Sequence, residues 1–235
     1  MIHLEILQNE IVSCRRCPRL IEYCTNIAKV KRRAFRDWTY WGKPVPSFGD
    51  PSARLLILGL APAAHGANRT GRVFTGDRSG DWLYRALHQT GFASQPESRS
   101  IDDGLALRDA YVSASVRCAP PDNKPSPEEI RSCREFLERE LDLLTNLVAV
   151  VALGKLAFDN YLKILKDRGV IRSRAPFVFA HNREHRIGPG VPLLISSYHP
   201  SQQNTSTGKL TEPMLRAVFE HARRGLSQPV RIPPD

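Results

Sequence analysis

Four short apolar runs, separated by stretches long enough for a helix, constrain the fold of this chain most. The runs are 55–58 (LLIL), 110–116 (AYVSASV), 147–154 (LVAVVALG) and 192–197 (PLLISS). Continuous apolar residues, rather than alternating ones, are typical of parallel strands that are buried on both faces. Because these runs alternate with helical segments, they predict an α/β protein. We expect a three-layer αβα sandwich around a short, four-stranded, mainly parallel sheet.

The helices are predicted from apolar periodicity and from capping residues. Ser126-Pro127-Glu128-Glu129 has the pattern of a capping box with proline at the first helical position, and it predicts a helix that continues to about Leu144. A last helix is expected from Thr211 to about Gly225. The other predicted helices are 2–12, 79–89 and 155–166. No repeat or low-complexity linker divides the chain, so we predict one domain, residues 1–225, followed by a tail, residues 226–235.

Three loops rich in glycine, proline and polar residues follow three of the predicted strands. They are 59–81 (GLAPAAHGANRTGRVFTGDRSGD), 117–127 (RCAPPDNKPSP) and 197–210 (SYHPSQQNTSTGKL). Ligands of parallel sheets bind outside the carboxyl ends of the strands, so we expect the three loops to converge. Asp77, Asn123 and His199 would there supply a base, an amide and a hydrogen-bond donor. Each also has a purely structural interpretation: a helix N-cap or turn for Asp77, an Asx-turn for Asn123 and a packed loop histidine for His199.

The five cysteines have a spacing typical of a metal site. Cys14 and Cys17 form a C-x2-C pair, and Cys118 and Cys133 lie far downstream. Disulfides are not expected in a reducing cytosol, whereas four such thiols can bind zinc or an iron–sulfur cluster. Burial of unrelated cysteines is the alternative. Cys24 is interpreted as a small buried apolar residue.

The charge of the chain favours a polyanionic partner. The formal net charge is +10, and eight lysine and arginine residues lie between positions 15 and 36. A basic surface that serves only solubility is the alternative. No apolar run approaches the roughly 18 residues of a membrane span, and the first residues do not resemble a secretory signal, so we expect a cytoplasmic protein.

Together, GLAPAAHGANRTGRVFTGD, RCAPPDNKP, SYHPSQQNT and the four-cysteine spacing closely resemble a family 5 (type B) prokaryotic uracil-DNA glycosylase. The resemblance covers about residues 10–225. It implies a uracil-DNA glycosylase-like fold and an enzyme of base excision repair, which flips uracil out of DNA and hydrolyses its N-glycosidic bond, leaving an abasic site. It also implies a 4Fe–4S cluster whose ligands are Cys14, Cys17, Cys118 and Cys133.

The resemblance further implies roles for residues of the three loops. Asp77 would position or activate the attacking water, Asn123 would assist near the base or the water, and His199 would donate to the carbonyl of the leaving base. Phe74 would stack on the flipped base, with core packing as the alternative. The backbone near Gly59, Ala61 and Ala63 would complete the base pocket. Contacts to DNA are expected from Arg69, Arg72, Pro200, Ser201, Gln202, Gln203 and Asn204, with the basic cluster at 29–36 on phosphates.

The segment after the first predicted strand predicts a tolerant base pocket. Leu60, Ala61, Pro62 and Ala63 stand where other glycosylase classes place an acid or an amide. A pocket with few fixed polar partners rejects few bases, so we expect activity on uracil and on some other deaminated or damaged bases. The resemblance to the family implies that these include hypoxanthine and ethenocytosine. Double-stranded DNA and a monomer are the expected partner and state. A noncatalytic nucleic-acid-binding module with a structural zinc site, and an enzyme acting on free nucleosides, are the alternatives from other classes.

Overall fold

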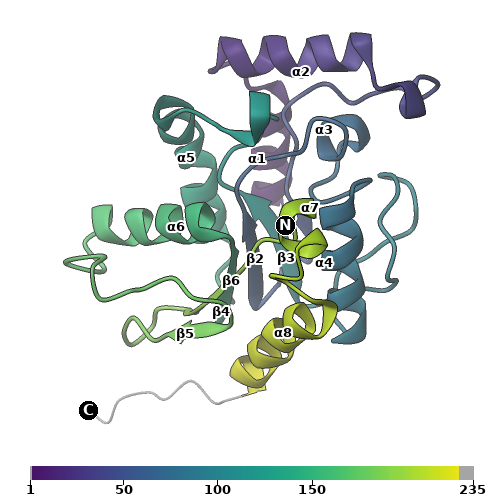
Figure 1. Cartoon of the computed structure of the whole chain (residues 1–235). Helices are drawn as coiled ribbons and strands as arrows, with labels where there is room; N and C mark the ends of the chain where they lie inside the picture. Colours follow the sequence, from purple (N-terminus) through teal and green to yellow (C-terminus); the bar gives the residue numbers. More distant parts are fainter. Residues whose placement is uncertain (1, 228–235) are drawn as a thin grey trace.

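One mixed sheet of six strands, in the order β1-β3-β2-β4-β6-β5, forms the centre of the protein (Figure 1). The structure is a computed structural model that describes residues 2–227. Its strands are β1 (Phe48–Gly49), β2 (Leu55–Gly59), β3 (Ala110–Ala114), β4 (Ala149–Leu153), β5 (Arg183–His185) and β6 (Leu193–Ser197). β3, β2, β4 and β6 are parallel, whereas β1 and β5 pair antiparallel at the two edges.

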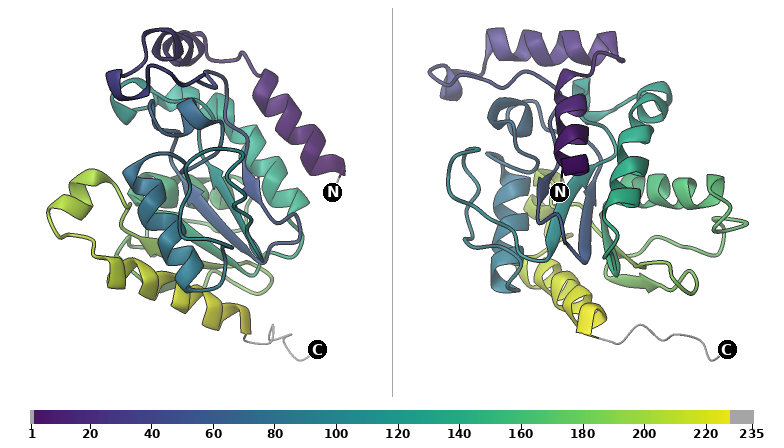
Figure 2. Two further views of the ribbon diagram at one scale, coloured as in Figure 1. Left: turned by 90° about the vertical axis from the view of Figure 1, so that its right-hand side faces the viewer. Right: turned by 180° about the vertical axis from the view of Figure 1, so that it is seen from behind.

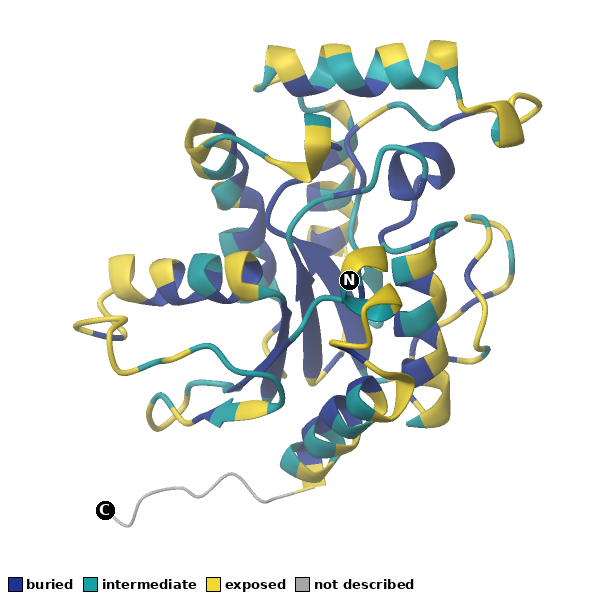
Figure 3. Cartoon of the chain, in the orientation of Figure 1, coloured by how far each residue is buried: buried dark blue, intermediate teal, exposed yellow. Residues whose placement is uncertain are grey.

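The predicted α/β class and the four parallel strands are confirmed, but the sheet is two strands wider than predicted. The central strands are almost wholly buried, which Figure 3 shows in dark blue, and this burial explains their continuous apolar sequence. The edge strands have only two and three residues and are partly exposed. They therefore carry no apolar run that sequence patterning could detect.

Helices cover both faces of the sheet (Figure 2). α4 (Arg78–Gln89) and α8 (Glu212–Ser227) bury one face, with Leu83, Leu87, Val218 and Phe219 in the shared core. α5 (Pro127–Leu143) and α6 (Lys155–Asp167) bury the other face, with Leu137, Phe158 and Tyr161. The predicted capping box of Ser126 and Glu129 is confirmed. Together these layers form the predicted three-layer sandwich.

The N-terminal helices pack at one end of the sandwich. α1 (Ile2–Ser13) contacts α5, and α2 (Pro18–Val30) lies across the top of the molecule in Figure 1. The short elements are η1 (Arg33–Phe35), α3 (Ala67–Thr70), η2 (Pro121–Asn123) and α7 (Gln202–Ser206). Within residues 2–227, no helix is long and apolar enough to cross a membrane.

The final helix extends beyond the predicted end of the domain. α8 continues to Ser227, two residues past the predicted boundary at residue 225. Residues 226 and 227 are therefore helical and not part of a tail. The remainder of the predicted tail, residues 228–235, lies outside the described residues.

Candidate active site

The three predicted loops start at the same edge of the sheet. β2, β3 and β6 are parallel members of one sheet, and they end at Gly59, Ala114 and Ser197. The segments that carry Asp77, Asn123 and His199 therefore leave the sheet at its carboxyl edge, as predicted.

Asp77 is the N-cap of α4, and its carboxylate is tightly enclosed. Its Oδ1 accepts a hydrogen bond of 3.0 Å from the backbone N–H of Gly80. A Cβ atom added to Gly66 would lie only 2.0 Å from Oδ2, so glycine at this position makes room for the carboxylate. Burial raises the pKa of Asp77 above its usual value, against the opposing effects of the Gly80 and Ser79 N–H groups and of Arg69. The structural interpretation as an N-cap is correct, and the hydrogen bond that forms the cap uses Oδ1.

Phe74 lies between the Asp77 loop and His199. The rings of Phe74 and His199 have centroids 5.8 Å apart and planes inclined by 32°. A Cβ atom on Gly59 would lie 2.8 Å from the Phe74 ring, so the end of β2 must be glycine for the ring to reach this place. Phe74 also has φ of 52°, which is unusual for a bulky residue and marks a backbone held by its surroundings. The Phe74 ring also packs against the core that α4 and α8 form with the sheet, so the alternative interpretation of Phe74, core packing, is correct in part.

His199 lines a cavity of about 510 Å³ together with Leu60, Gly154, Tyr198 and Asn204. Burial lowers the pKa of His199 from 6.5 to about 4, so the imidazole is neutral at pH 7. Its backbone is fixed because the Asn204 side-chain amide donates a hydrogen bond of 2.9 Å to the His199 carbonyl. A neutral imidazole can donate one N–H to an acceptor in this cavity.

Asn123 is exposed at the end of η2 and has φ of 56°. Its side chain makes no hydrogen bond with another residue in 2–227, so the proposed Asx-turn is not formed. Its backbone N–H donates to the Pro120 carbonyl at 3.2 Å. Asn123 lies on the expected edge of the sheet, but the structure gives it no contact with Asp77 or His199.

Arg69 and Arg72 do not have the solvent access that phosphate contacts require. Each is only 3% exposed. Arg72 donates to the Thr75 and Ser98 hydroxyls at 2.9 Å and pairs with Asp103 at 2.7 Å. The prediction that these two arginines bind DNA phosphates is therefore wrong for this conformation, because both guanidinium groups are engaged inside the protein.

Arg69 instead supports the loop that carries Asp77. Its guanidinium donates to the carbonyls of His65 at 2.8 Å and Gly76 at 2.6 Å. The same group stacks on Phe35 at 3.9 Å and Trp38 at 4.1 Å from the ring centroids. Sequence reasoning missed this support, although aromatic residues within a basic segment were a signal for it.

The 199–204 segment forms a capped turn of helix. Ser201 is the N-cap of α7 and accepts a 3.4 Å hydrogen bond from the Asn204 N–H. Gln202 and Gln203 are exposed, so they are available for DNA, whereas Pro200 is buried and is not. The predicted DNA contact of Pro200 is thus wrong for this conformation, and Asn204 already uses its amide on His199.

The cysteines gather at the junction of α1, α2, α5 and the loop after β3. Cys14, Cys17, Cys118 and Cys133 belong to one apolar cluster, and Cys24 is fully buried beside them, as predicted. Burial raises the pKa of the Cys133 thiol to about 11, and the hydrogen bond of 3.3 Å that the Arg117 N–H donates to its sulfur opposes this shift.

The four cysteines of this cluster agree in number and chemistry with the ligands of a 4Fe–4S cluster, which binds four thiolates on four separate irons. Four thiolates are also a donor set for zinc. Within residues 2–227, no group of three or more cysteine, histidine or acidic side chains is close enough to hold a single ion.

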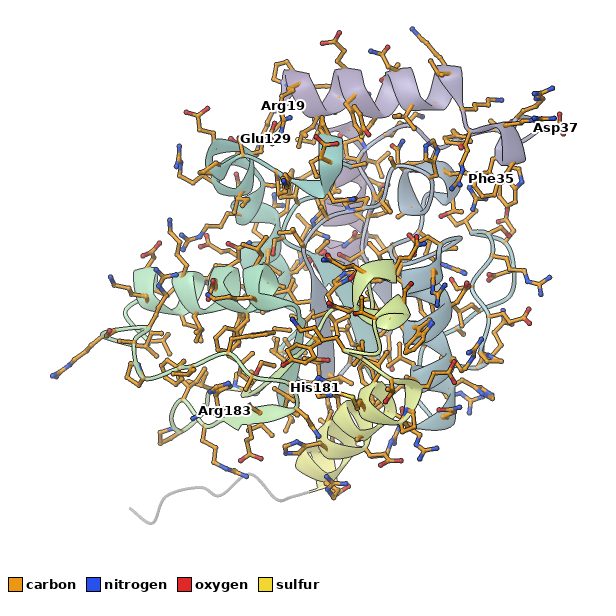
Figure 4. The ribbon with its side chains drawn as sticks, in the orientation of Figure 1. Arg19, Phe35, Asp37, Glu129, His181 and Arg183 are labelled. Carbon is orange, nitrogen blue, oxygen red and sulfur yellow. The ribbon has the colours of Figure 1, made fainter. Side chains whose placement is uncertain are left out.

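Acidic side chains of α5 neutralise part of the basic N-terminal segment. Arg19 pairs with Glu129 at 2.7 Å, and Figure 4 shows these two side chains meeting from α2 and α5. Arg16 pairs with Glu135 at 2.6 Å. Arg32, Arg33 and Arg36 are exposed around η1, so the 29–36 cluster still presents positive charge to solvent.

Comparison with known proteins identifies the class of protein. The family model of the uracil DNA glycosylase superfamily matches residues 46–223, so this chain belongs to that superfamily. It is 49% identical over 218 residues to the type-5 uracil-DNA glycosylase of Mycobacterium tuberculosis, which covers 92% of this chain and 80% of the relative. The type-5 enzyme of Thermus thermophilus is 47% identical over 220 residues, 94% of this chain and 97% of the relative. That of Pyrobaculum aerophilum is 42% identical over 214 residues, 91% and 89%.

Within the superfamily, the chain is a member of the type-5 uracil-DNA glycosylases. The predicted resemblance and the predicted class of enzyme, a DNA repair glycosylase, are confirmed. The noncatalytic binding module and the nucleoside enzyme are thereby set aside. The comparisons do not assign roles to individual residues, so those roles remain proposals.

Proposed function

We propose that this protein excises uracil from double-stranded DNA as a monomeric, monofunctional glycosylase of the cytoplasm, with Asp77 and His199 as its principal catalytic residues. The observation that carries this proposal is the arrangement around Phe74, whose ring contacts His199 while its loop continues directly into the enclosed carboxylate of Asp77. A flipped base could stack on this ring between a donor for the leaving group and an acceptor near the sugar.

Asp77 has one oxygen available for chemistry. Oδ1 is occupied by the Gly80 N–H, which leaves Oδ2 to accept a hydrogen bond from a water molecule. Cleavage of the glycosidic bond puts positive charge on the sugar, and an ionised carboxylate stabilises it. The N-terminus of α4 supports this negative charge, since helix N-termini favour anions.

His199 would donate a hydrogen bond to the departing base. Negative charge grows on the carbonyl oxygens of uracil as the bond breaks, and a donor already in position stabilises that charge. The lowered pKa of His199 means that the donor is a neutral imidazole at pH 7. The hydrogen bond from Asn204 fixes the backbone of this residue, and the Phe74 ring lies beside the imidazole.

Asn123 would act only in the DNA complex. Its exposed amide has unused hydrogen-bonding capacity at the edge of the sheet where the base enters. Binding of DNA could bring it to the base or to the water, because catalytic contacts often tighten only when substrate is bound.

We expect a broad range of substrates. The residues after β2 are Leu60, Ala61, Pro62 and Ala63, which offer no side-chain hydrogen bond to the edge of a base. Wrong bases therefore leave no buried polar side chain unpaired there, and hypoxanthine and ethenocytosine should be accepted.

Cys14, Cys17, Cys118 and Cys133 would hold a 4Fe–4S cluster. When bound, it would join α1 and α2 to α5 and the loop after β3, in a structural rather than a redox role. Arg32, Arg33 and Arg36 would contact phosphates of the duplex, so binding should weaken steeply as salt rises.

The first experiment is single-turnover excision on a uracil-containing duplex, with alkaline cleavage to reveal abasic sites. We expect excision by the wild type, and Asp77→Asn and His199→Ala should each slow it by at least about tenfold. An inactive wild type would contradict the activity, and wild-type rates in both variants would contradict the assigned roles.

A further inference from the structure

A second cavity of about 340 Å³ lies between α5 and α6, outside the site described above. Ser115 and Lys124 contribute to its wall, and both belong to the segment that follows β3. Leu156, at the start of α6, lines this cavity and also the His199 cavity, so the two are neighbours. Lys124 follows Asn123 directly. The second cavity thus opens beside the edge of the sheet where DNA is expected.

Every charged side chain that lines this cavity is basic. They are Lys124, Arg131, Arg134 and Lys163. Arg134 is already paired with Glu138 and Asp167, and Arg131 lies 3.8 Å from Glu128. Lys124 and Lys163 make no ion pair with another residue in 2–227, and both are exposed. The rim is therefore suited to an anion such as a phosphate group.

The walls of the cavity are mainly apolar, formed by proline, isoleucine and leucine side chains. Leu156 is 53% exposed, which leaves a large apolar side chain uncovered between the two cavities. Apolar walls of this kind suit the face of a nucleobase, because an unstacked base recovers part of its lost stacking free energy when it packs against apolar side chains.

Asn160 provides a polar group within these walls. Its Nδ2 atom is buried and has no hydrogen-bond partner in the described part of the chain. A buried donor without a partner is costly, so it is rare unless a ligand or a water supplies an acceptor. The edge of every DNA base offers such acceptors.

We propose that the α5–α6 cavity is a second nucleotide subsite, which takes one unstacked nucleotide of the DNA substrate other than the nucleotide that is excised. The base would contact the apolar walls and Asn160, and its phosphate would lie against Lys124 and Lys163. The proposal rests on the proposed function, because it assumes that DNA occupies the neighbouring His199 cavity. The subsite would hold the duplex distorted while the uracil is outside it, and so contribute to binding rather than to bond cleavage.

The test combines removal of single bases with variants of the cavity. Duplexes would contain 2′-fluorouridine, whose fluorine disfavours positive charge on the sugar and so slows cleavage, and a tetrahydrofuran residue in place of one base at each nearby position in turn. Dissociation constants would be measured for the wild type, Asn160→Leu, Lys163→Ala and Lys166→Ala. Lys166→Ala is the matched control, because Lys166 is an exposed lysine of α6 that does not line the cavity.

We expect one position at which base removal weakens binding by the wild type about tenfold. The same removal should have little further effect in Asn160→Leu. Lys163→Ala should weaken binding to the intact duplex, and Lys166→Ala should weaken it less. Equal sensitivity of the wild type and Asn160→Leu at every position would overturn the proposal, as would equal effects of the two lysine variants. Excision of ordinary uracil by the wild type, measured in parallel, separates failure of the subsite from failure of the proposed function.

Discussion

Substitution of Gly66 by alanine should displace the carboxylate of Asp77. The new methyl carbon would lie 2.0 Å from Oδ2, whereas an ordinary contact begins at 3.4 Å, so the oxygen must retreat by about 1.4 Å. Gly66 has φ of −100° and ψ of −105°, a backbone conformation that residues with a Cβ atom rarely adopt, so the substitution strains the backbone as well as crowding Oδ2. Misplacement of a reacting group by about 1 Å can reduce a rate about 100-fold.

We therefore expect Gly66→Ala to slow single-turnover excision of uracil by about 100-fold. The free energy of unfolding should fall by about 2–4 kcal/mol, because the substitution disturbs the Asp77 N-cap and strains the backbone of residue 66. The rate would be measured at saturating enzyme on a uracil duplex, and the stability by urea unfolding.

Gly188→Ala is the control for this experiment. A Cβ atom at Gly188 meets nothing within 4 Å, so the rate should not change. In Asp77→Asn the carboxylate is already absent, so adding Gly66→Ala should slow that variant much less than it slows the wild type. An unchanged rate in Gly66→Ala, or equal effects in both backgrounds, would refute the reasoning.

Three further predictions concern Arg69, His199 and the cysteine cluster. Arg69→Met should lower the free energy of unfolding by about 2–4 kcal/mol and slow excision, because it leaves the Gly76 carbonyl without its donor and removes two cation–π contacts. Wild-type stability in urea together with a wild-type excision rate would contradict the support of the Asp77 loop by Arg69. The unfolded chain protonates His199 below about pH 6.5 and the folded one only below about 4, so this residue destabilises the wild type as pH falls through that window. Between pH 7 and pH 5, the free energy of unfolding in urea should therefore fall less for His199→Gln than for the wild type, by on the order of 1–2 kcal/mol. An equal fall in the two proteins would contradict the lowered pKa of His199. Cys14→Ser should lose iron and the broad visible absorption band, whereas Cys24→Ala should keep both, and stoichiometric zinc in the wild type would overturn the assignment of the cluster.

The strands and helices that sequence patterning predicted are those with strong local signals. β2, β3, β4 and β6 are buried on both faces and so have continuous apolar sequences, and the capping box of α5 is complete within four residues. β1 and β5 have no such pattern, since they are short and are held by pairing with a neighbour distant in sequence. α2 was missed because its segment was interpreted through its charges and cysteines.

The placement of Asp77 and His199 at one edge of the sheet was predictable from the order of the loops, but the surroundings of the two arginines were not. Asp77 and His199 follow strands whose parallel pairing brings their ends together. The sequence shows that Arg69 and Arg72 carry the positive charge that a phosphate-binding residue needs. The structure shows that Arg72 pairs with Asp103 and that Arg69 donates to two backbone carbonyls, so neither guanidinium is free for a phosphate. Burial of a charged side chain depends on its distant partners, and a single sequence does not contain that information.

The two shortest strands have a consequence for association between copies of the protein. A long unpaired strand at the border of a sheet is a template on which another chain can add its own strand. Here the borders are Phe48–Gly49 and Arg183–His185, which offer few free backbone groups, and Arg183 adds a charge. Strand-to-strand aggregation between copies of the protein is therefore disfavoured.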